Sequence, residues 1–146
     1  MLRGSALAKV DDKGRVKIPN LFRTFIEETY GRDVFVTSDS GACVQVFPLA
    51  VWIEKEKKIA ALPSMDPSVL RYQKVVNYFG QPASLDDQGR LLIHPLLRSH
   101  SGMQGEVTVI GQQIYLEIWN REKFEAILGS DPFTDEDRRV LSSHGI

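Results

Sequence analysis

The chain has 146 residues, of which 42% are hydrophobic and 25% are charged, as is ordinary for one or two small globular domains. Its single cysteine, Cys43, excludes an intrachain disulfide framework and a multi-cysteine zinc site, and it fits a reducing compartment. No apolar run approaches the roughly 20 residues that cross a bilayer, and the first residues lack the apolar core of a secretory signal.

The net charge of −1, taken alone, argues against a nucleic-acid partner. The charge is nevertheless distributed unevenly. Residues 1–25 carry six basic and two acidic side chains, a surplus of +4, whereas residues 129–146 carry two basic and four acidic side chains. The basic surplus therefore lies on the first part of the chain, and an unevenly charged, solvated surface stays an alternative interpretation.

The first motif predicts a β-hairpin followed by a helix. An apolar run ending at Val10 leads into residues 11–15, which read D-D-K-G-R. Asp-Asp-x-Gly between β-forming runs is typical of a hairpin loop, because glycine adopts the positive φ that such a loop requires. Apolar side chains alternate over residues 16–18, and Pro19 ends this strand and suits the first turn of a helix. Arg15 is therefore expected at the tip of a stiff hairpin.

Four further elements are expected before residue 62. Apolar side chains recur at helical spacing over residues 20–30, which predicts a helix. Residues 33–37 and 42–47 have the composition of two strands separated by a polar turn. Residues 49–61 predict a second helix, whose run of charged residues forms its solvated face.

Two prolines, Pro63 and Pro67, bracket a connector that we interpret as a domain boundary. Either Asp66 or Ser68 is placed to cap a helix that runs from about residue 68 to residue 79.

The motif at residues 11–23 occurs again at residues 86–98, at a constant offset of 75 positions. The second copy reads D-D-Q-G-R-L-L-I-H-P-L-L-R, so Gln88 takes the place of Lys13 and Arg90 takes the place of Arg15. Self-similarity at a fixed offset indicates a repeated structural unit. We therefore expect a second hairpin, followed by a short helix that begins at Leu96.

The remaining pattern completes a second unit. Residues 106–110 and 114–119 predict strands, and Asn120 is placed to cap a helix that reaches Leu128. The polar tail has one short helical stretch, over residues 135–141. A unit of about 50 residues has little core of its own and has open strand edges. We therefore expect the two units to pair as a pseudo-dimer, each completing the sheet of the other.

These boundaries divide the chain into four parts. They are a first unit at 1–62, a helical connector at 63–80, a second unit at 81–128 and a polar C-terminal tail at 129–146.

On these residues the chain resembles the MraZ family of bacterial transcriptional regulators, which are built from two SpoVT/AbrB-like swapped-hairpin units. The likeness rests on the two D-D-x-G-R motifs in order, on V-F-P-L-A-V-W and E-I-W after them, and on the connector L-P-S-M-D-P. The resemblance implies an α+β fold, an internally duplicated swapped-hairpin AbrB-like β-barrel pseudo-dimer with flanking helices.

The resemblance also implies a function. It implies a DNA-binding repressor, not an enzyme, that acts on its own operon in the division and cell-wall gene cluster by binding short direct repeats in the promoter. The implied partners are double-stranded promoter DNA and further copies of the chain in a ring-like homo-oligomer, with no membrane, small-molecule substrate, cofactor or metal. The implied location is cytoplasmic and nucleoid-associated.

The candidate DNA contacts are polar or cationic side chains near the two hairpin loops, namely Arg3, Lys13, Arg15, Gln88 and Arg90. Arginine presents a planar donor fork that can hold a phosphate or a guanine edge with two bonds. Lys13 adds a point charge at the loop tip, and we expect Arg3, just before the first strand, to run beside that loop. The first unit is therefore predicted to be the main DNA reader, and the second mainly an assembly partner.

Alternatives stay open at this point. Arg15 and Arg90 could pair with the aspartates of their own loops and only fix the turns. The whole chain could be an antitoxin-type regulator of the same fold, or a structural oligomerisation module that does not touch DNA. An enzyme is disfavoured, because the sequence has neither a nucleophile elbow nor a glycine-rich phosphate loop. Cys43 and Trp52 are expected to be core residues.

Overall fold

The computed structural model describes residues 1–146 and contains the same order of elements twice. The first repeat comprises β1 (Ser5–Val10), β2 (Arg15–Lys17), α1 (Asn20–Tyr30), β3 (Asp33–Thr37), β4 (Val44–Pro48) and α2 (Leu49–Ala60), and α3 (Pro67–Tyr78) follows it. The second repeat comprises β5 (Gln81–Ser84), β6 (Arg90–Leu92), α4 (Pro95–Ser101), β7 (Gly105–Gly111), β8 (Leu116–Asn120) and α5 (Arg121–Ser130), and α6 (Asp135–Ser142) ends the chain. The predicted order of hairpin, helix, hairpin and helix is confirmed in both repeats.

Local hydrogen bonds set several of the helix boundaries. Asp66 caps α3, because its side chain accepts a hydrogen bond from the backbone N–H of Ser68 at 2.8 Å. This bond decides between the two capping residues that the sequence left open. Asn120 caps α5 in the same way, accepting from Lys123 N at 3.0 Å. Gly102 ends α4 in the left-handed conformation, with φ of 66°.

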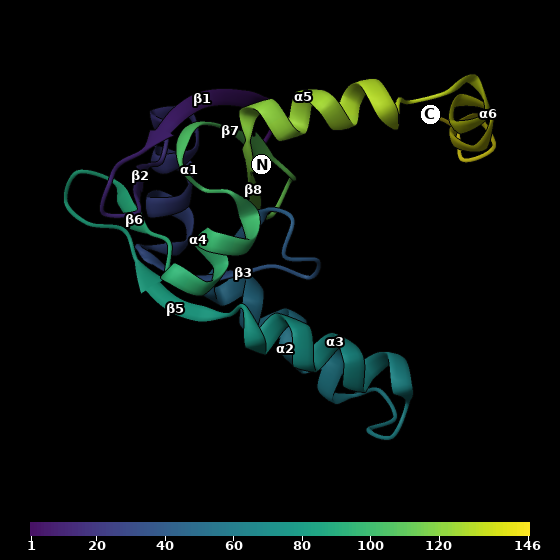
Figure 1. The fold of residues 1–146 in the computed structure, drawn as a ribbon. Coiled ribbons are helices and arrows are strands. Elements are labelled where there is room, and N and C mark those ends of the chain that lie inside the picture. Colours follow the sequence, from purple (N-terminus) through teal and green to yellow (C-terminus); the bar gives the residue numbers. More distant parts are fainter.

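All eight strands form one antiparallel sheet in the order β5-β3-β4-β8-β7-β1-β2-β6, which curls into a nearly closed barrel (Figure 1). Strand β1 of the first repeat pairs with β7 of the second, and β5 of the second pairs with β3 of the first. Each repeat therefore contributes its first hairpin to the sheet of the other. This exchange confirms the swapped-hairpin pseudo-dimer and the α+β class.

The strand register reveals an internal twofold relation. Val16 of β2 pairs with Leu91 of β6, which lies 75 positions later and has the same place in the second motif. On the other side of the barrel, Gln45 of β4 pairs with Glu117 of β8. Because equivalent strands pair with each other at both places, a pseudo-twofold axis passes through the β2–β6 and β4–β8 pairs.

The barrel interior holds the main hydrophobic core, which both repeats supply. Val16 and Ile18 from the first motif have 0% exposure, as have Leu91 and Ile93 from the second. Alternate residues of a strand point to opposite faces, so the intervening residues of β2 and β6 point outward. The motif therefore builds the core with one set of side chains and the outer surface with the other.

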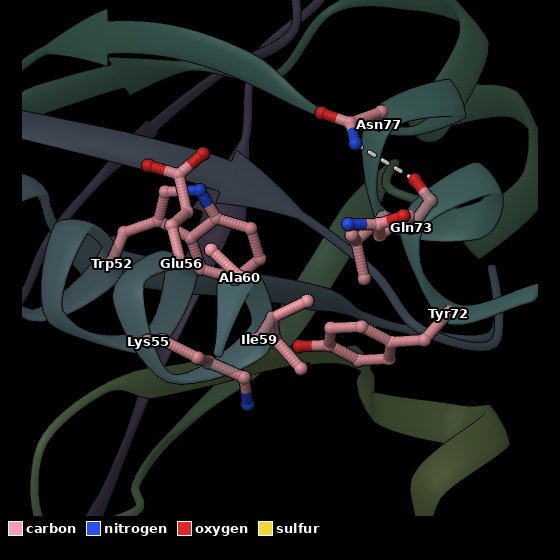
Figure 2. Close-up of a pocket in the computed structure, with 9 residues that line it drawn as sticks. Trp52, Lys55, Glu56, Ile59, Ala60, Tyr72, Gln73 and Asn77 are labelled. Atoms are coloured by element: carbon pink, nitrogen blue, oxygen red, sulfur yellow. Dashed lines mark hydrogen bonds between the residues drawn. The ribbon is translucent and has the colours of Figure 1, made fainter. Parts of the chain in front are cut away.

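A second, smaller core lies between the barrel and the helix pair α2 and α3, which project together from the barrel (Figure 1). Phe35 of β3 stacks on Trp52 of α2, with ring centroids 4.6 Å apart. A cavity of about 260 Å³ separates the two helices, and Figure 2 shows Ile59 of α2 facing Tyr72 of α3 in it. Trp52 is thus a packing residue, as predicted.

The C-terminal helices differ from the rest of the fold. α5 has no buried residue, and it leads away from the barrel towards α6 (Figure 1). The helix predicted near residue 135 is confirmed as α6, whose start is fixed by a capping box between Thr134 and Asp137. None of the six helices combines the length and the apolar composition that crossing a membrane requires.

The pairing of β2 with β6 predicts a large difference between two adjacent leucines. Leu91 is fully buried on the pseudo-twofold axis, whereas Leu92 is 56% exposed. Leu91→Ala should lower the free energy of unfolding by about 2–5 kcal/mol, and the control Leu92→Ala should change it by less than about 0.5 kcal/mol. Urea unfolding followed by circular dichroism measures both. Equal losses would contradict the inward orientation of Leu91.

Candidate nucleic-acid interface

The first hairpin loop is held by the carboxylate of Asp11. Its Oδ1 accepts hydrogen bonds from the backbone N–H groups of Lys13 at 3.0 Å and Arg15 at 2.8 Å. The backbone N–H of Gly14 donates to the carbonyl of Asp11 at 3.0 Å, and Gly14 adopts φ of 82°, in the region that favours glycine. The aspartate and glycine of the motif are therefore turn formers, and they leave the side chain of Lys13 exposed at the tip.

The side chain of Arg15 folds back onto the same carboxylate. Its Nε donates to Oδ2 of Asp11 at 2.9 Å, and the side chain is 32% exposed. Its two terminal nitrogens have no hydrogen-bond partner within the protein, and neither is a buried, unpaired atom. One edge of the guanidinium thus braces the turn while the other is open to solvent. Fixing the turn and contacting an external anion are therefore compatible roles for Arg15.

The second loop repeats this geometry. Oδ1 of Asp86 accepts from the backbone N–H groups of Gln88 at 2.9 Å and Arg90 at 2.8 Å. Nε of Arg90 donates to Oδ2 of Asp86 at 2.8 Å, and the Arg90 side chain is 33% exposed. The hydrogen bonds between the aspartate and the backbone are therefore the same in both loops. The difference between the loops is chemical, because residues 11–15 carry no net charge whereas residues 86–90 carry −1.

Both loop carboxylates are stabilised in their charged form. The pKa of Asp11 is lowered, chiefly by the hydrogen bond from the backbone N–H of Arg15, with further contributions from the Arg15 side chain and Lys13. The pKa of Asp86 is lowered in the same way by Arg90 and Gln88. The two Asp–Arg pairs are therefore intact at neutral pH, and each holds its arginine in one orientation.

The β2–β6 ladder brings a further cation to the same surface. Lys17 pairs with Arg90 in the register of the two strands. Arg15 and Lys17 flank the inward-pointing Val16, so both side chains lie on the outer face. The outer face of this ladder thus carries Arg15, Lys17 and Arg90 together. Lys17 was not among the predicted site residues. Its alternation with Val16 is the signal that places it there.

Each loop is held by one arginine of the opposite repeat, and neither arginine was among the predicted site residues. Nη2 of Arg23, on α1 of the first repeat, donates to the backbone carbonyl of Asp87 in the second loop at 2.9 Å. Arg98, on α4 of the second repeat, packs so closely on Gly14 of the first loop that any side chain at Gly14 would overlap its guanidinium. The sequence signal for this role was the repeat itself, because Arg23 and Arg98 end the two motifs at the same offset of 75.

Backbone hydrogen bonds reinforce these crossed contacts. Ile18 N donates to the carbonyl of Gly89, and Ile93 N donates to the carbonyl of Gly14, both at 2.9 Å. Each loop is therefore anchored to the strand end of the other repeat. The two loops lie at one end of the molecule, at the left of Figure 1, and they form a single surface together with the β2–β6 ladder.

Arg3 lies elsewhere, and the expectation that it runs beside the first loop is wrong. Leu2 forms an isolated bridge with Gln113, and the backbone of Arg3 lies against Gly111 at the end of β7. The six residues of β1 separate Arg3 from Asp11, a span of roughly 20 Å at the usual rise of an antiparallel strand. Pairing of β1 with β7 fixes this separation, so Arg3 is not part of the loop surface.

A single barrel in which two repeats of one chain exchange hairpins defines the class of the protein as a duplicated, AbrB-like swapped-hairpin protein. The family model described as "MraZ protein, putative antitoxin-like" matches residues 1–73 and 81–143, which include both repeats. Proteins named "Transcriptional regulator MraZ" are similar over the full length of both chains, at 39% identity in Acidobacterium capsulatum and 41% in Koribacter versatilis. A protein of that name from Nitrosomonas europaea is 34% identical over 86% of this chain and 84% of its own. The chain belongs to the MraZ family.

Because Arg23 and Arg98 each contact the loop of the opposite repeat, replacing either one should loosen the loop that it contacts and leave the other loop as it was. Arg98→Ala should speed amide hydrogen exchange in residues 11–15 and leave residues 86–90 unchanged, because Arg98 packs on Gly14 of the first loop whereas Arg23 packs on Gly89 of the second. Arg23→Ala should do the reverse. Arg23→Ala removes one hydrogen bond, a loss that corresponds to exchange roughly two- to tenfold faster, whereas Arg98→Ala removes the packing of its side chain on Gly14. Hydrogen–deuterium exchange resolved by NMR measures both loops, and each variant serves as the control for the other. Loosening of the same loop in both variants would contradict the crossed arrangement.

The loop carboxylates predict a component of acid sensitivity. Because the folded-state pKa values of Asp11 and Asp86 are lowered, their contribution to stability is fully present above the unfolded pKa of about 3.9 and is lost as the pH falls through the folded values. The double variant Asp11→Asn, Asp86→Asn should therefore show a shallower fall in Tm between pH 6 and pH 3 than the wild type. Asp12→Asn is the control, since the Asp12 side chain has no hydrogen-bond partner, and it should keep the wild-type profile.

Proposed function

We propose that this chain is a DNA-binding transcriptional regulator that represses its own operon, in the division and cell-wall gene cluster, by binding direct repeats in the promoter. The relatives named as transcriptional regulators support this proposal. The observation that carries it is the pair of braced arginines. Arg15 and Arg90 are each fixed through Nε while their terminal nitrogens stay open to solvent.

Bracing favours DNA recognition for an energetic reason. A free arginine side chain loses rotamer entropy when it binds, and this loss subtracts from affinity. Arg15 and Arg90 are already ordered by their aspartates, so less entropy is lost on binding. A planar guanidinium edge matches two phosphate oxygens, or O6 and N7 of guanine in the major groove. Two such edges on one rigid ladder therefore suit the backbone and the base edges of a duplex.

The first loop is proposed as the main reader. Lys13 stands at its tip where the second loop has Gln88, so only the first loop offers a cation to a phosphate at that point. Residues 86–90 of the second loop carry a net charge of −1, but Arg32 pairs with Asp87 at 2.6 Å and offsets it, so the difference between the loops rests on Lys13 against Gln88. Lys17, beside Arg90 on the ladder, adds a phosphate contact between the two loops.

Self-association is proposed to supply the affinity that one chain lacks. A protomer with a net charge of −1 and only a few exposed cations on its loop surface would bind DNA weakly. A homo-oligomer repeats this surface, and linked sites multiply apparent affinity when their spacing matches that of the sites on the partner. Promoter DNA with repeated sites meets this condition, and the proposed location is therefore with the cytoplasmic nucleoid.

The proposal predicts unequal effects of two equivalent substitutions. Arg15→Ala should weaken binding to DNA from upstream of the chain's own coding sequence by roughly 5- to 150-fold, the range for losing an arginine contact worth about 1–3 kcal/mol. Arg90→Ala should weaken it less. Gel shifts measure both, and thermal melts check that each variant is folded. Arg121→Ala is the control, because Arg121 pairs with Glu106 on β7 and not with a loop residue.

Two outcomes would count against the proposal. A greater loss from Arg90→Ala would overturn the division between the loops while leaving DNA binding in place. No binding of the wild type to the upstream DNA would overturn the function itself and favour an oligomerisation module without DNA contact.

A further inference from the structure

The internal repeat shows which surface of the second unit lacks a cover. Helices α2 and α5 occupy equivalent places, since they follow the equivalent strands β4 and β8. Helix α3 lies beside α2, and Trp52 of α2 is only 4% exposed. No helix of the chain lies beside α5 (Figure 1), and α5 has no buried residue. The equivalent helix is therefore covered in one unit and bare in the other.

The bare helix and the segment after it present apolar side chains to solvent. Ile127 is 37% exposed, Leu128 is 55% exposed and Phe133 is 56% exposed. We call residues 127–142 the C-terminal arm. The arm ends in α6, whose first turn carries three acidic residues. Apolar side chains gathered on a projecting, acidic segment are typical of a protein contact surface.

An apolar groove of about 660 Å³, which also carries basic residues, lies at the start of β8, the end opposite to α5. It is formed by the end of α1, one side of α2 and the turn between β7 and β8. Its floor includes Phe47 and Tyr115, stacked with centroids 4.5 Å apart, and Ile114, which is 47% exposed. Lys55 and Lys58 also line it. The groove is thus apolar with two cations along the α2 side.

We propose that the C-terminal arm of one copy docks in this groove of a second copy. Phe133 packs on the apolar floor, and the acidic start of α6 faces Lys55 and Lys58. The charges are complementary, since residues 129–146 carry a net −2 whereas the groove is lined by two lysines and a single acidic residue, Glu54.

The occupant is a second copy because the arm of the same chain leads away. Helix α5 begins after Asn120, at the end of β8 that lies farthest from the β7–β8 turn, and it carries the arm outward from the barrel (Figure 1). Arm and groove are different surfaces, so the contact is head-to-tail, and successive contacts of this kind close into a ring when the rotation between neighbouring copies allows it. This inference rests on the self-association proposed above, and it names the surfaces responsible.

Engineered cysteines test the contact directly. The native Cys43 is 3% exposed, and burial raises the pKa of its thiol, so it does not interfere. Full-length Phe133→Cys and Ile59→Cys variants, mixed and mildly oxidised, should form disulfide-linked pairs that contain one chain of each. The double variant should form a ladder of covalent multimers. Met65→Cys, at an 81% exposed site outside the groove, is the matched control for Ile59→Cys.

The results separate this inference from the proposed function. Only intramolecular cross-linking in the double variant, or no more cross-linking than with the Met65→Cys control, would overturn it. Phe133→Glu should lower the mass measured by light scattering towards the 16.5 kDa of one chain while the fold persists, and an unchanged mass would also overturn it. Cross-linked multimers that fail to bind DNA would leave the inference standing and defeat the proposed function.

Discussion

The pairing of β2 with β6 across the pseudo-twofold axis is the constraint on which the rest of the structure depends. Val16 meets its own counterpart Leu91 there, and the carbonyl of each loop glycine accepts a hydrogen bond from the strand end of the opposite repeat. A three-residue strand has too few backbone bonds to hold a loop rigidly by itself. Because each loop is fixed by the other repeat, neither repeat can form its loop surface alone, and folding of the barrel and formation of the loop surface are one event.

The same arrangement explains how a stiff surface arises from short elements. The inward residues of the ladder build the core, and the residues between them carry the cations outward. Arg23 and Arg98 are positioning residues, since each acts on a loop that belongs to the other half of the chain. Their contacts anchor each loop, and with it Arg15 or Arg90, to the opposite half of the chain.

Sequence reasoning succeeded where the information was local. The repeat at a fixed offset, the turn chemistry of Asp11 and Gly14 and the cap at Asn120 predicted the elements and the duplicated fold, because hydrogen bonds within a few residues determine them. It failed where a long-range pairing decides position. Arg3 was placed beside the first loop because it precedes β1, but the pairing of β1 with β7 puts it at the opposite end of that strand. Arg23 was missed for the same reason, since its partner is 64 residues away.

Fusing the two repeats into one chain has a consequence for direction. A symmetric dimer of identical chains presents the same residue at both loop tips. It therefore has no preferred direction when it binds along a linear molecule. Here lysine stands at one tip and glutamine at the other, on loops with otherwise equal backbone geometry. The protomer is therefore directional, although its backbone is nearly symmetric. It can distinguish the two directions of an asymmetric linear partner, and successive protomers can bind along that partner in the same orientation.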